Sequence, residues 1–147
     1  MTQAIIFTND NGGVSVCIPT GELPIEQVKT KDTPVGSLIV NISDLPSQYN
    51  DFFNAWELAN EVVTVSLTKA KDIAKNNLRT ERTPVLASLD VSFMRAVESG
   101  NTSQQTAIAE QKQELRDITA HSSITGATTV DGLKTAMNNL INEIKAQ

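Results

Sequence analysis

Aromatic residues and cysteines are scarce in this chain of 147 residues. Aromatic residues make up 4% of the sequence and hydrophobic residues 39%, so a folded core must consist mainly of aliphatic side chains. Cys17 is the only cysteine, and no CxxC or Cys/His pair with metal-ligand spacing occurs. These absences exclude an internal disulfide framework and a structural zinc site. The length still suffices for one ordinary domain or two small ones.

Long apolar runs are also missing. The longest covers only a few residues, whereas a helix that spans a bilayer needs roughly 20. The opening MTQAIIFTND does not have the basic segment followed by a long apolar one that marks a secretory signal. We therefore expect a soluble, unsecreted chain with no membrane partner.

Motifs for catalysis and cofactor binding are absent from the sequence. It contains no HExxH, no GxxxxGK, no GxGxxG and no EF-hand loop, so we expect neither a metal nor a cofactor. The only Cys/His pair that could supply a nucleophile and a base is Cys17 with His121. Cys17 lies in a strand pattern, where cysteine usually acts as a small buried residue, and His121 lies in a polar loop. The chain is therefore predicted not to be an enzyme.

Acidic residues outnumber basic ones and give a net charge of −5, which is unevenly distributed. Residues 1–66 carry eight acidic residues against two lysines, whereas residues 67–82 carry five basic residues against two acidic ones. The acidic balance disfavours nonspecific binding to nucleic acid, and we expect no nucleic-acid partner. The basic segment has helical spacing and no aromatic residue for base stacking. We interpret it as a solvated or acid-facing helix surface rather than a nucleic-acid site.

The front of the chain is predicted to contain β-hairpins. Residues 4–18 show an apolar run, turn residues from Asn9 to Gly13, and then an alternating strand. A third strand is expected at residues 37–42. Between them, a short helix is expected at residues 24–31, with three residues facing inward: Leu23, Ile25 and Val28.

Half of the aromatic residues lie close together at Phe52, Phe53 and Trp56. Such a cluster indicates either a small core against the sheet or an exposed binding patch, and we favour the core. A second hairpin is expected around Asn60 and Glu61. Residues 1–66 are thus predicted to form a small α+β unit.

From residue 67 onward the apolar residues recur at three- and four-residue steps, as they do in α-helices. Pro84 lacks the amide that a helix needs and restricts the residue before it, so we expect it to start a new helix capped by Thr83. A single kinked helix is the alternative. The expected fold class is therefore α+β, with a helical region at residues 67–147 behind the front unit. Its helices are expected at about residues 68–82, 84–99, 102–119 and 129–145.

The two middle helices are predicted to form an antiparallel hairpin, because only a short turn around Gly100 separates them. Thr102 or Ser103 would cap the second of them, and residues 120–127 are expected to form a loop. The residues expected to face inward come from both helices: Leu86, Leu89, Phe93, Ala96 and Val97 from the first, and Ile108, Leu115 and Ile118 from the second.

A C-terminal amphipathic helix, with Thr128 as its expected cap, carries a heptad seam. A seam of fewer than two heptads is marginal alone in water, so it must pack within the chain or against a second copy. Its residues step by four, three and four along the sequence: Leu133, Met137, Leu140 and Ile144.

Two further residues are candidates for binding a partner. Val85 and Met94 fall off the main apolar stripe of their helix, although methionine on a helix often fills a core. Together with the heptad seam they are the predicted partner-binding residues. A homo-oligomer is one of the expected assemblies.

Several segments, in order, resemble a group of tailed-bacteriophage tail proteins of the tail assembly chaperone-like or tail-fibre-associated kind. The resemblance covers roughly residues 3–135, and residues 133–147 depart from it with a longer and more regular seam. The segments that carry it are IIFTNDNGGVSVCIPTGELPIEQV at residues 5–28, SDLP at 43–46, FFNAWEL at 52–58, RTPVLASLDVSFMRAVESG at 82–100 and KQELRDI at 112–118.

The resemblance implies a non-enzymatic phage tail structural or fibre-attachment protein, made in the host cytoplasm and located in the virion tail. Its implied partners are other phage tail proteins. A transient tail assembly chaperone that leaves before maturation is the alternative. The resemblance gives no catalytic residue, and within it we expect Asp90, Arg116 and Asp117 to hold the helical hairpin together.

Overall fold

The computed structural model describes residues 2–147 and has an α+β fold. The chain divides into two compact units, one up to Ala70 and one from Lys71 onward. The expected boundary after Ser66 lies slightly too early, because the first turn of helix α2 (Leu67–Glu98) belongs to the first unit.

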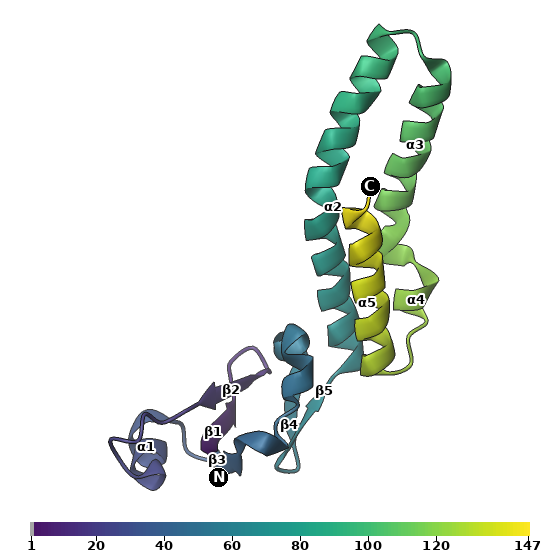
Figure 1. Ribbon diagram of the computed structural model, residues 1–147. Coiled ribbons are helices and arrows are strands. Elements are labelled where there is room, and N and C mark those ends of the chain that lie inside the picture. Colours follow the sequence, from purple (N-terminus) through teal and green to yellow (C-terminus); the bar gives the residue numbers. More distant parts are fainter. Residues whose placement is uncertain (1) are drawn as a thin grey trace. The chain divides into compact units, whose positions relative to one another are not determined.

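A three-stranded antiparallel sheet forms the centre of the first unit (Figure 1). Its strands β1 (Gln3–Thr8), β2 (Val14–Cys17) and β3 (Leu38–Asn41) lie in the order β2-β1-β3. The antiparallel pairing of β1 with β2 confirms the hairpin predicted at residues 4–18. The pairing of β3 with β1 confirms the third strand.

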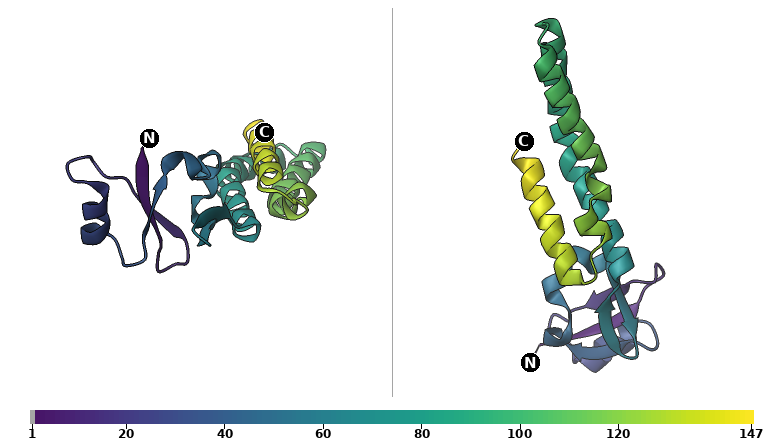
Figure 2. Two further views of the ribbon diagram at one scale, coloured as in Figure 1. Left: turned by 90° about the horizontal axis from the view of Figure 1, so that it is seen from below. Right: turned by 90° about the vertical axis from the view of Figure 1, so that its right-hand side faces the viewer.

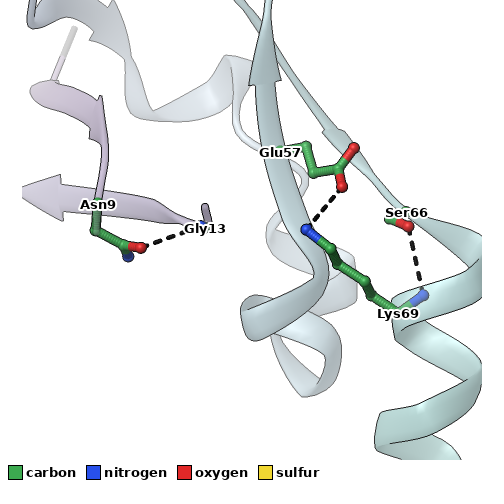
Figure 3. A network of polar contacts seen from close by, with 5 residues as sticks. All are labelled: Asn9, Gly13, Glu57, Ser66 and Lys69. Carbon is green, nitrogen blue, oxygen red and sulfur yellow. Dashed lines mark hydrogen bonds and ion pairs between the residues drawn. The ribbon is translucent and has the colours of Figure 1, made fainter. Parts of the chain in front are cut away.

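The side chain of Asn9 holds the turn of the first hairpin. Its Oδ1 atom accepts hydrogen bonds from the amides of Asn11 at 3.1 Å and Gly13 at 3.0 Å, the second of which is drawn in Figure 3. Gly12 has φ of +79°, a conformation that a Cβ atom makes costly. The asparagine and the glycines therefore have the turn roles that the sequence predicts.

The second predicted hairpin is also present. Strands β4 (Trp56–Ala59) and β5 (Val62–Val65) pair antiparallel. The two residues between them, Asn60 and Glu61, have φ of +51° and +66°. Two consecutive residues with positive φ are the mark of a type I′ turn, whose twist matches that of the strands it joins.

The aromatic cluster forms a core, as predicted. Phe52 is fully buried and Trp56 nearly so, while Phe53 stays partly exposed with its ring 4.8 Å from that of Trp56. The indole Nε1 atom of Trp56 donates to the carbonyl of Tyr49 at 3.3 Å, inside the 3₁₀ segment η2 (Ser47–Ala55). Trp56 belongs to an apolar cluster with three other buried residues: Ile6, Val14 and Leu45.

Helix α1 (Ile25–Asp32) buries none of its residues. The prediction that Leu23 faces inward is wrong, because its side chain is exposed, whereas Ile25 and Val28 are half-buried and lie on the more covered side of the helix. The apolar cluster of the sheet is already covered by Leu45, Trp56 and partly buried residues of β4 and β5. Helix α1 lies against β1 and adds only partial burial to the first unit.

Within the first unit, Lys69 ties the first turn of α2 to strand β4 (Figure 3). Its Nζ atom lies 2.8 Å from Oε1 of Glu57, and its amide donates to Oγ of Ser66 at 3.4 Å. At Lys69 the basic segment thus faces an acidic residue, Glu57. This agrees with the interpretation of the segment as a solvated or acid-facing helix surface.

Helices alone build the second unit. The part of α2 in this unit and α3 (Thr102–Asp117) form the predicted antiparallel hairpin. Helix α5 (Val130–Lys145) runs beside the half of the hairpin that is farther from its turn, and it does not reach the turn (Figures 1 and 2). The hairpin therefore has a three-helix half and a two-helix half, the latter ending at Gly100.

Pro84 lies inside one continuous helix, so the predicted break into helices at about 68–82 and 84–99 is wrong. Thr83, the expected cap, instead donates its hydroxyl to the carbonyl of Arg79 at 2.8 Å within the helix. The turns on both sides of the proline are held by tertiary packing, with Leu78 buried before it and Ala96 buried after it. This packing outweighs the roughly 3 kcal/mol that an interior proline costs.

The turn of the helical hairpin lies around Gly100, as predicted, but the cap of α3 lies earlier than expected. Gly100 has φ of +70°, and the amides of Gly100 and Asn101 donate to the carbonyls of Val97 and Ala96, which closes α2 in a Schellman motif. Asn101 caps α3 through the amide of Gln104 at 3.0 Å, in place of Thr102 or Ser103.

Helix α5 is capped one residue later than expected. The hydroxyl of Thr129, not of Thr128, accepts from the amide of Gly132 at 3.0 Å. The segment predicted as a loop at residues 120–127 contains the short helix α4 (Ser122–Thr125), in which Ile124 is fully buried. A single buried isoleucine in a polar segment gives too weak a periodicity to predict a helix.

The heptad seam of α5 is buried within the chain. Leu133 and Ile144 have no exposed surface, and Met137 and Leu140 are 2% and 4% exposed. Nδ2 of Asn77 on α2 lies 3.5 Å from the sulfur of Met137, so α5 packs against α2. Of the two packing modes that the sequence left open, the structure shows the one within the chain, and these four residues are not available to a partner.

Arg82 connects α2 to the end of α3. Its Nη1 atom donates to the carbonyls of Leu115 at 3.1 Å and Arg116 at 2.7 Å. These carbonyls belong to the last turn of α3, where a helix has few amide partners of its own and a positive charge is favourable; that of Leu115 also accepts from the amide of Ile118. Arg82 therefore caps α3 from the neighbouring helix.

We predict that Leu140→Asp unfolds the second unit. A carboxylate buried among apolar side chains, together with the lost packing of Leu140, lowers the free energy of unfolding by about 3–5 kcal/mol. Urea unfolding followed by far-UV circular dichroism measures the loss. Asn139→Asp, at the exposed neighbouring position, is the control and stays close to the parent. An intact fold in Leu140→Asp, with only a lower assembly mass, would show that the seam faces another chain.

We predict that Arg82→Met destabilises the second unit by about 1–2 kcal/mol, because two carbonyls at the end of α3 lose a charged donor. Arg79→Met is the matched control, because the Nη1 atom of Arg79 donates only to Asn76 on the same exposed helix surface. Its expected effect is below about 0.5 kcal/mol in the same urea titration. Equal losses in the two variants would contradict a capping role for Arg82.

Candidate partner-binding surface

Among the six residues predicted to bind a partner, Met94 alone is exposed. Its exposed fraction is 57%, whereas the four seam residues are buried and Val85 is half-buried. Val85 and Met94 are nine residues apart, which is two and a half helical turns, so they lie on opposite sides of α2. The α5 seam is therefore covered within the chain and not free for a partner, Val85 is half covered on the side of α2 away from Met94, and Met94 remains the exposed candidate.

Two neighbours of Met94 form an exposed apolar row with it. Val91 is 52% exposed and Val97 is 45% exposed, and the three residues follow one another at steps of three. Val97 was expected to face inward, which is wrong, and Val91 was not identified from the sequence. A helix pair buries a narrower side of each helix than a bundle does, so only the strip that includes Ala96 is covered.

The inner side of the two-helix half is held by polar contacts as well as by packing. Lys112 of α3 forms an ion pair with Asp90, and its Nζ atom lies 5.6 Å from the ring centroid of Phe93. Nε2 of Gln105 donates to the carbonyl of Ala96 at 3.3 Å. These contacts keep the outer side of α2 in a fixed orientation along this half of the hairpin.

The polar residues that the resemblance singled out have different roles from one another. Asp90 does join the two helices, through Lys112. It does not lie at the start of a helix, because α2 is continuous, so the expected interaction with a helix dipole is absent. Asp117 accepts from Nε2 of Gln113 on its own helix at 3.0 and 3.1 Å, and Arg116 contributes its carbonyl to the contact with Arg82.

Cys17 and His121, the only pair considered for nucleophilic catalysis, belong to different units. Cys17 is half-buried at the end of β2. His121 is exposed, and its Nδ1 atom lies 2.7 Å from the hydroxyl of Ser123 and accepts from the amide of the same residue. The imidazole thereby caps the short helix α4.

An open hollow of about 660 Å³ lies between α4 and α5. It is lined mainly by exposed polar side chains, among them His121, Asp131 and Glu143. Thr129 in its wall caps α5 and His121 caps α4, so two of its polar groups have structural partners. The hollow is open to solvent and has the character of a surface depression more than of an enclosed ligand pocket.

Within residues 2–147, the His, Cys, Asp and Glu side chains nowhere form a group of three or more that could hold a metal ion. In the same part of the chain, every helix is too short or too polar to cross a membrane. Comparison with known proteins gives no match to a family model, a curated protein or a solved structure.

Proposed function

We propose that this protein is a non-enzymatic component of a bacteriophage tail, structural or fibre-attaching, that acts through contacts with other tail proteins in the virion. The exposed row of Val91, Met94 and Val97 on the helical hairpin is the observation that carries the proposal. The resemblance of segments in residues 3–135 to tail proteins supplies the setting.

The exposed row has the properties of a protein-binding surface. A rigid helix with apolar side chains at helical spacing is a recurring way to fill a groove on a partner. The hairpin contacts at Asp90 and Ala96 hold this helix in place, so little conformational entropy is lost on binding. Apolar side chains that stay exposed together are more typical of a contact surface than of an isolated soluble helix.

The same surface would also serve a tail assembly chaperone that covers an apolar segment of an unassembled tail protein. The two functions differ in what remains in the mature particle. A structural component stays at a fixed copy number, whereas a chaperone leaves.

We predict that quantitative mass spectrometry of purified virions finds this chain at a stoichiometric copy number relative to other tail proteins, because a structural contact is kept after assembly. Gold labelling of an epitope-tagged chain should place it on the tail in electron micrographs. Its absence from virions, combined with defective tails when the gene is deleted, would replace the structural function with the chaperone. Intact tails after deletion would overturn both.

A further inference from the structure

The outer side of α2 carries a second heptad seam, distinct from that of α5. Its four residues step by three, four and three, and all are exposed: Pro84, Ala87, Val91 and Met94. We call these four residues the outer seam. In a helix with the spacing of a coiled coil they occupy alternating a and d positions, which lie on one narrow strip. Val97 adjoins the strip at a flanking g position.

We propose that the outer seam pairs with the outer seam of a second copy of this chain, with the two α2 helices parallel and in register. The inference rests on the proposed function and names a second copy as one of the contacts within the tail. Ala87, Val91 and Met94 of one copy then pack against the same residues of the other, as a and d residues do in parallel coiled coils.

The charges beside the outer seam favour this partner and this direction. Asp90 occupies a g position and Arg95 the e position that follows it, five residues later. In a parallel pair of helices, g of one helix lies beside the following e of the other. Two ion pairs therefore form, each joining Asp90 of one copy to Arg95 of the other.

Asp90 remains able to make this contact although it already pairs with Lys112. Its side chain is 62% exposed, whereas that of Lys112 is only 17% exposed. The carboxylate thus has an open side toward solvent. Lys112 restrains the rotamer of Asp90, which lowers the entropy that the second contact would cost.

An antiparallel pairing uses the same apolar residues but loses the charge complementarity. Antiparallel helices place g beside g and e beside e, so in the register that packs Val91 of each copy against Met94 of the other, Asp90 would face Val97 and Arg95 would face Ser88. The seam ends at Glu98, the last residue of α2, where the carboxylates of a parallel pair can turn into water.

The pairing is expected to be weak in dilute solution. A seam of two a and two d positions buries much less than the roughly 800 Å² per partner of a stable interface. A dissociation constant on the order of 10–1,000 μM is therefore expected. Attachment of several copies to one particle raises their effective concentration into this range.

We predict that Val91→Glu weakens self-association about tenfold or more. Sedimentation equilibrium of the purified full-length chain, from about 10 μM to about 1 mM, should show a monomer–dimer equilibrium for the parent. In the variant, two carboxylates face each other across the seam, and the dissociation constant rises about tenfold or more. Val62→Glu is the matched control, because Val62 is 57% exposed and lies in the first unit. Val62→Glu should leave the dissociation constant unchanged. Arg95→Lys should also leave it unchanged, whereas Arg95→Glu should raise it.

Disulfide trapping is predicted to show the parallel direction. In a Cys17→Ala background, Ala87→Cys chains and Glu98→Cys chains are mixed in equal amounts and oxidised mildly. A parallel pair brings identical positions together, so each variant should form disulfides with its own kind. An antiparallel pair in which Val91 of each copy packs against Met94 of the other brings position 87 beside position 98 and would give mainly mixed disulfides, which differ in mass and would overturn the proposed direction.

Two outcomes would overturn the self-pairing itself. One is a monomer at every concentration tested, and the other is a dimer that Val91→Glu leaves intact. A monomeric chain whose Val91→Glu variant fails to enter virions would assign the outer seam to a different tail protein. The two results on self-association do not decide whether the chain is a virion component. The composition of the purified particle decides that separately.

Discussion

The burial of the α5 seam is the constraint on which the second unit depends. Leu133, Met137, Leu140 and Ile144 are all nearly or fully covered, and α5 is long enough to cover only one half of the hairpin. The other half must then be stable as two helices. It achieves this with a narrow apolar strip, a capped turn at Gly100, and the contacts of Lys112 and Gln105 across the pair.

This division explains why exposed apolar residues collect where they do. In the three-helix half, apolar side chains of α2 such as Leu78 have a partner helix and are buried. In the two-helix half, Val91, Met94 and Val97 have none, because α3 covers only the opposite side of α2. The same helix therefore has a core-forming segment and a segment with an apolar outer face.

Local signals in the sequence predict most of the helices, strands and turns. They do not predict which other element packs against each of them. Turn residues such as Asn9 and Gly12, and the period of α5, depend on contacts within a few residues, and the structure contains both hairpins and the last helix. Pro84, Val97 and Leu23 were misjudged, because their states depend on which other element reaches them. Met94 was identified because it falls off the inner stripe, whereas Val91 was missed since a lone valine on a helix gives no such signal.

The continuity of α2 through Pro84 has a consequence for the outer face. If the helix broke at Pro84, the residues before and after it would have independent rotations, and no seam could include the proline. Because α2 is one helix, Pro84, Ala87, Val91 and Met94 keep a common phase and Asp90 keeps a fixed offset from Arg95. Arg82, two residues before the proline, also ties this turn to the end of α3. The position at which the sequence suggests a break is thus where the hairpin is held and where its outer seam begins.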